Sequence, residues 1–104
     1  MQNHKQSKSI HHFAMECEEW ARLFANKDEL ANQGCNTEEI KILSHLSKVL
    51  GNLAFACGDL DRSELAGMVE SLNQQVDTIP EHASSLYVKR ACRTLKEFLS
   101  EFPR

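Results

Sequence analysis

Apolar residues recur at alternating intervals of three and four positions through most of this chain. The first series is Ile10, Phe13, Cys17, Trp20 and Phe24. This spacing puts the side chains on one face of an α-helix and predicts a helix with one buried stripe. Three further series with the same period follow. A sandwich or barrel of many strands needs a turn about every 8–12 residues, and the chain has only four Gly and two Pro.

Capping residues place the starts of the predicted helices. Ser, Asn and Asp side chains favour the position before a helix, and candidates stand at Ser9, Asn36 and Asp61. Glu39 and Glu64 follow the last two by three residues, as in a capping box. Gly34 is suited to end the first helix.

The remaining signals complete the helix boundaries. Gly58 stops the second apolar series, and Asn26 is a weak point within the first helix. Pro80 is suited to the first turn of the last helix, because a residue there needs no N–H donor. The sequence therefore predicts helices over residues 9–32, 37–57, 62–79 and 81–102.

Short connections determine how these helices should pack. Linkers of about two to six residues make consecutive helices antiparallel. We therefore expect an all-α fold, an antiparallel up-down four-helix bundle that forms a single domain over residues 9–104, with a flexible polar segment at residues 1–8. The apolar stripes, Trp20 included, should form its core.

Charge and cysteine usage indicate a cytoplasmic protein. Twelve Lys and Arg oppose fifteen Asp and Glu, so the net charge is −3. The uncharged run over residues 49–58 is about half as long as a membrane helix, and no apolar run of signal-peptide length follows the amino terminus. Four Cys without a CxxC spacing are typical of a reducing compartment. Cys35, in the loop after Gly34, is expected to be the most accessible thiol.

Patterns typical of enzymes and of metal sites are missing from the sequence. It contains no Gly-x-Ser-x-Gly turn, no Gly-rich phosphate loop and no Glu-x-x-His of a di-iron bundle. His12 and Glu16 stand one helical turn apart, but no third ligand accompanies them. We therefore predict a protein that is not an enzyme and that uses no cofactor, metal ion or small-molecule substrate.

The segment around His45 resembles the histidine phosphotransfer domains. These are four-helix bundles with a Lys three residues after the phosphorylated His and a Gly directly after that Lys. Lys48 matches the Lys, whereas Val49 stands in place of the Gly, which comes later as Gly51. The resemblance implies that His45 accepts a phosphoryl group and that Lys48 stabilises it. The alternative is an exposed or half-buried structural His.

Small residues form a second stripe on two of the predicted helices. The stripe comprises Ser44, Ser47, Gly51, Ala54 and Gly58, and on the next helix Ser63, Gly67 and Ser71. Glycine within a helix costs about 0.5–1 kcal/mol relative to alanine, so another group should occupy the missing volume. Either Gly51 and Gly67 face each other across a close helix crossing, or a partner binds in a notch there. In the second case the candidate contacts are the four small residues Gly51, Gly67, Ser47 and Ser63.

The last predicted helix carries a basic strip, with Lys89, Arg93 and Lys96 on one face. Such a strip suits nucleic-acid phosphates, an acidic protein or simply solvent. No aromatic residue interleaves the basic ones, and no helix-turn-helix pattern precedes them, which argues against nucleic-acid binding.

These observations favour a small cytoplasmic protein–protein interaction module without catalytic activity: an adaptor, an inhibitor or an immunity-type regulator. Ile42, Val49 and Phe55 lie off the main apolar stripe and exceed what a small bundle needs. They predict a protein partner or a homodimer. A phosphotransfer bundle using His45 is the alternative, and a nucleic-acid-binding bundle is the third interpretation.

Overall fold

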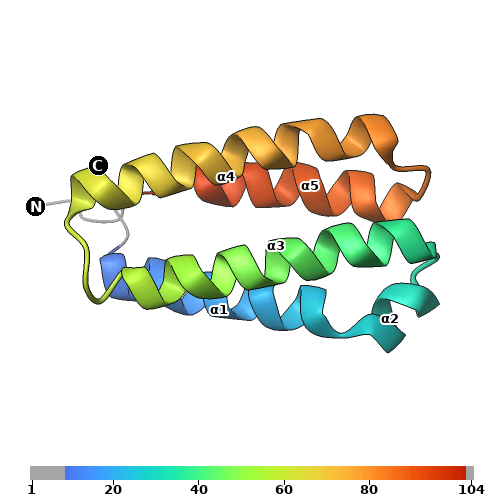
Figure 1. Cartoon of the computed structure of the whole chain (residues 1–104), viewed down its shortest axis with the longest axis horizontal. Coiled ribbons are helices and arrows are strands. Elements are labelled where there is room, and N and C mark those ends of the chain that lie inside the picture. The colour runs from blue at the N-terminus through green and yellow to red at the C-terminus, as the bar shows by residue number, and fades with distance from the viewer. Residues whose placement is uncertain (1–8, 103–104) are drawn as a thin grey trace, which may run out of the picture.

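The computed structural model describes residues 9–102, so the segment predicted to be flexible, residues 1–8, lies outside it. The described residues form five helices: α1 (Ile10–Ala25), α2 (Lys27–Asn32), α3 (Thr37–Ala56), α4 (Arg62–His82) and α5 (Leu86–Leu99). The four long helices lie side by side, and each runs opposite to the one before it (Figure 1). The all-α prediction is confirmed, but the described residues include a fifth helix that the sequence pattern did not separate.

Asn26 divides the first predicted helix. Its backbone leaves the helical region at ψ 87°, and its side chain accepts a hydrogen bond from the N–H of Glu29 at 3.2 Å. An Asn side chain competes in this way with the helical hydrogen bonds. The prediction of one continuous helix over residues 9–32 is therefore wrong. Phe24 and Leu30 are buried on either side of the break, but they stand six positions apart, which is off the three-and-four spacing of one continuous helix.

The boundary between α4 and α5 also differs from the prediction. Pro80 lies in the last turn of α4 and not in the first turn of the next helix. At that position its missing N–H removes only one hydrogen bond, and the helix ends shortly afterwards at His82. The Ser85 side chain then caps α5 by accepting from the N–H of Val88. Phe102 is buried although it lies beyond the end of α5.

The predicted caps at the other helix starts are confirmed. Ser9 accepts a hydrogen bond from the N–H of His12 at 3.0 Å. Both predicted capping boxes are closed, one formed by Asn36 with Glu39 and the other by Asp61 with Glu64. These reciprocal hydrogen bonds satisfy N–H groups that the first helical turn leaves without partners.

Gly34 ends α2 in the left-handed conformation, with φ at 92°. The N–H of Gly34 donates to the carbonyl of Ala31, and the N–H of Cys35 donates to the carbonyl of Leu30, both at 3.1 Å. This is a Schellman motif, which folds the following residue back over the helix end. Cys35 is consequently buried with 8 % of its surface exposed, and the expectation that it is the most accessible thiol is wrong.

Alkylation should therefore modify Cys57 before the other thiols. Cys57 is half-buried, whereas the other three cysteines are buried. Burial raises the pKa of every thiol, that of Cys92 to about 11, so exposure decides the order of reaction. Timed alkylation followed by peptide mass mapping should show Cys57 labelled first. Earlier labelling of Cys35 would contradict the described loop.

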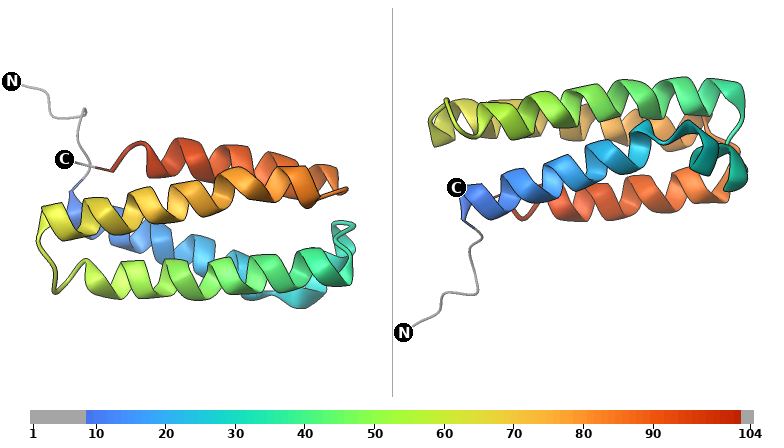
Figure 2. Two further views of the ribbon diagram at one scale, coloured as in Figure 1. Left: turned by 45° about the horizontal axis from the view of Figure 1, so that its top comes forward. Right: turned by 90° about the horizontal axis from the view of Figure 1, so that it is seen from below.

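The core is closed by aromatic contacts between α1 and α5. Phe13 stacks on Phe98 with ring centres 4.8 Å apart. It also packs edge-to-face with Phe102, with ring centres 5.1 Å apart. Trp20 is only partly buried and packs at the margin of this cluster, with its ring centre 5.4 Å from that of Phe24. Figure 2 shows α1 between α3 and α5, with α4 diagonally opposite.

Candidate functional site

An open groove runs along the surface between α3 and α4. Its apolar lining comes from Val49, Leu60, Met68 and Leu72, and its remaining lining from Glu64, Gly67, Ser71 and Gln75. A methyl group added at Gly67 would meet no atom within 4 Å outside its own helical backbone, and the same holds at Gly51. The predicted close crossing of these two glycines is therefore wrong. The volume left by Gly67 is open to solvent.

The small residues of α3 serve a different contact from the predicted one. The Ser47 hydroxyl donates a hydrogen bond to the carbonyl of Ala21 in α1 at 2.6 Å, and Ala54 on the same stripe is buried. Ser47 thus helps to hold α1 against α3. Ser63 is exposed in the first turn of α4. Of the four small residues predicted to bind a partner, only Gly67 lines the α3–α4 groove.

Alanine substitutions at two glycines should change stability in opposite directions. Gly67→Ala should raise the free energy of unfolding by about 0.5–1 kcal/mol, because alanine favours the helix and no atom obstructs its methyl group. Gly34→Ala should lower it by about 1–2 kcal/mol, because the left-handed backbone strains a residue with a Cβ. Urea denaturation of both variants checks this. A loss of stability in Gly67→Ala would mean that α4 packs closely at that point.

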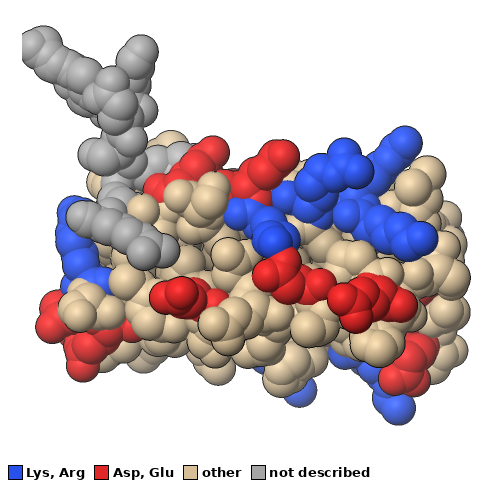
Figure 3. Space-filling view, turned by 90° about the horizontal axis from the view of Figure 1, so that it is seen from above, with Lys and Arg blue, Asp and Glu red and all other residues tan. Residues whose placement is uncertain are grey.

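The predicted basic strip on α5 is bordered by acidic groups. Lys96 forms an ion pair with Asp77 of α4, and the charge of Lys89 acts on the carboxylate of Glu39. Arg93 is exposed. On the face shown in Figure 3, Lys and Arg side chains gather towards one end, with Asp and Glu side chains beside them. The strip is therefore not a continuous positive surface of the kind that follows a nucleic-acid backbone.

His45 and Lys48 both lie exposed on the outer face of α3. Residues three apart in a helix share a face, so the two side chains are neighbours. Lys41, one turn before His45, is also exposed. This arrangement leaves the imidazole accessible between two cationic side chains.

The pair formed by His12 and Glu16 is present, with Nε2 and Oε2 2.9 Å apart. Over residues 9–102 no group of three or more His, Cys, Asp or Glu side chains is placed to hold a metal ion.

Glu39 is a buried carboxylate whose second role the sequence did not reveal. Besides closing its capping box, its Oε2 atom accepts hydrogen bonds from the N–H groups of Ser84 and Ser85, each at 2.9 Å. Burial alone would raise the pKa of Glu39. The N–H donors, Asn36 included, and the positive charge of Lys89 outweigh burial and lower the pKa. Glu39 thus ties the start of α3 to the linker between α4 and α5.

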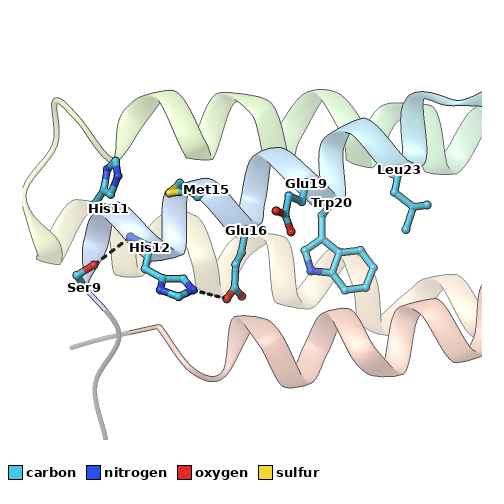
Figure 4. Close-up of a pocket in the computed structure, with 8 residues that line it drawn as sticks. All are labelled: Ser9, His11, His12, Met15, Glu16, Glu19, Trp20 and Leu23. Atoms are coloured by element: carbon cyan, nitrogen blue, oxygen red, sulfur yellow. Dashed lines mark hydrogen bonds and ion pairs between the residues drawn. The ribbon is translucent and has the colours of Figure 1, made fainter. Parts of the chain in front are cut away.

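A second groove, which follows α1 and reaches the seam between α1 and α5 at Trp20 and Leu23, also went unpredicted. On α1 it is lined by His12, Glu16, Glu19, Trp20 and Leu23, among others (Figure 4). Towards α5 it continues over Tyr87, Arg90, Ala91 and Thr94. The one sequence signal was Leu23, an apolar residue at the edge of the first stripe.

Comparisons with models of protein families, with curated proteins and with solved structures find no match for this chain. None of the helices within residues 9–102 combines the length and the apolar character that crossing a membrane requires.

Proposed function

We propose that this protein is a protein–protein interaction module without catalytic activity, acting as an adaptor, an inhibitor or an immunity-type regulator. Its fold is then an antiparallel up-down four-helix bundle in which α2 is a short insertion. The observation that carries the proposal is the open space above Gly67 in the α3–α4 groove. Glycine weakens a helix, and within residues 9–102 no neighbouring group occupies the space that a side chain at this position would take.

The groove suits a partner that presents a large apolar side chain. Leu72 is buried beneath it, Val49 and Met68 are half-buried, and Leu60 is 36 % exposed. An apolar side chain placed over Gly67 would cover these residues. Burying such a side chain contributes about 1.5–3 kcal/mol, which is typical of an interface anchor.

Photo-crosslinking from two adjacent glutamines tests this proposal. Gln75 lines the groove, whereas Gln74 is exposed and does not line it. A photo-reactive side chain at residue 75 should crosslink a defined protein in cells of the source organism. The same group at residue 74 should not. Absence of a protein adduct from residue 75, or identical adducts from both positions, would reject the groove as the binding site.

A phosphotransfer bundle is the second candidate, favoured by the exposure of His45 beside Lys48. In this reaction an imidazole nitrogen attacks a phosphoryl donor such as acetyl phosphate and releases acetate. Intact mass should then show a gain of about 80 Da that His45→Gln abolishes. An unchanged mass of the wild-type protein after incubation with acetyl phosphate and with a phosphorylated receiver would exclude this candidate.

A further inference from the structure

The α1–α5 groove defined above is lined in part by apolar side chains of both helices. Trp20, Leu23, Tyr87 and Ala91 line its middle. Leu23 is 39 % exposed, and Met15, at the α1 edge, is 51 % exposed. In Figure 4 the Trp20 and Leu23 side chains extend from α1 towards α5. Apolar side chains that line an open surface groove are typical of an interaction surface.

The two walls of this groove carry opposite charges. The α1 wall presents Glu16 and Glu19, while the α5 wall presents Arg90. Arg93 follows Arg90 after one helical turn and is also exposed. A partner that fits both walls must carry a basic edge beside an acidic edge, with apolar residues between them. A second copy of this chain provides that arrangement.

We infer that the α1–α5 groove is the interface of a symmetric homodimer whose two-fold axis runs parallel to the helices. Rotation about this axis puts α1 of each copy against α5 of the other. The acidic wall of one protomer then meets the basic wall of its partner at two equivalent places. The apolar middle of the seam faces its own copy, as in the isologous contacts of most soluble dimers.

The size of the molecule is compatible with this arrangement. Its principal extents are 45, 25 and 21 Å. One long face therefore suffices for the about 800 Å² that a stable interface covers on each partner. This inference does not depend on the α3–α4 groove, which lies between the other two long helices, so either proposal can fail alone.

Charge reversal tests the inference. Glu19 and Arg90 are both exposed, so Glu19→Arg and Arg90→Glu should leave the fold intact, as circular dichroism can verify. Each single variant puts like charges together at both contacts and should weaken the dimer at least about tenfold. The double variant, with both charges exchanged in one chain, should restore it. Analytical ultracentrifugation measures the dissociation constant in each case.

Glu18→Arg is the matched control. It makes the same change in net charge one residue away, but Glu18 lies towards the α1–α3 side of the helix, among residues such as Phe55 and Cys57. The dissociation constant of the dimer should be the same for this variant as for the wild type. A wild-type protein that stays monomeric at about 100 µM would overturn the inference. So would equal weakening by Glu18→Arg, or a folded double variant that remains monomeric.

Discussion

Phe13→Ala should lower the free energy of unfolding by about 3–5 kcal/mol. Phe13 is fully buried, stacks on Phe98 and meets the edge of Phe102. Its removal leaves a cavity between α1 and α5 and separates the residues after α5 from the core. The loss is a large fraction of the about 5–15 kcal/mol that stabilises a typical domain. Urea denaturation followed by circular dichroism measures it.

Phe55→Ala is the control for this prediction, because it deletes the same side chain from an exposed position. Phe55 is 78 % exposed on α3, so its truncation should change stability by no more than about 0.5 kcal/mol. Similar losses in the two variants would show that the aromatic core is assigned to the wrong residues.

Glu39→Ala should lower the free energy of unfolding by about 3 kcal/mol. The substitution opens the capping box at the start of α3 and leaves the N–H groups of Ser84 and Ser85 without their acceptor. Hydrogen bonds to a charged group contribute more than neutral ones, and partly buried donors without partners add a further penalty. Glu38→Ala is the control, since Glu38 is exposed in the same helical turn. The Glu38→Ala variant should lose less than about 1 kcal/mol of the free energy of unfolding.

The contribution of Glu39 should also depend on pH. Because folding lowers the pKa of this carboxyl below its usual value of 4.5, the stabilisation is complete above that pH. It is lost as the pH falls through the lower pKa of the folded protein. Denaturation at several pH values should show the difference between wild type and Glu39→Gln shrinking in acid. A difference that is independent of pH would contradict the ionised, hydrogen-bonded state of Glu39.

Local signals in the sequence were sufficient for most of the fold. Ser9, Asn36, Asp61 and Gly34 act at helix ends as predicted, because caps depend only on residues a few positions away. The break at Asn26 was not predicted as a helix end. Leu23 and Leu30 stand seven positions apart, so the sequence keeps an apparent helical period across it, whereas the residues that the structure buries there are Phe24 and Leu30.

Contacts between distant segments could not be predicted in the same way. Glu39 meets Ser84 and Ser85 across 45 and 46 residues, and nothing in its capping box indicates them. The choice between a close crossing and an open notch at Gly67 depends on the distance between α3 and α4. A stripe of small residues permits close approach but does not require it. The α1–α5 groove likewise arises only from the packing of two helices at opposite ends of the chain.

Binding by Gly67 variants tests the central claim, that a protein partner occupies the α3–α4 groove. With the protein captured from residue 75 as ligand, isothermal titration should compare wild type, Gly67→Ala and Gly67→Leu. The leucine side chain should fill the open space, leave the fold at least as stable as wild type and weaken binding by at least about tenfold. Gly67→Ala should bind more tightly than Gly67→Leu. Wild-type affinity in a folded Gly67→Leu variant would contradict the account.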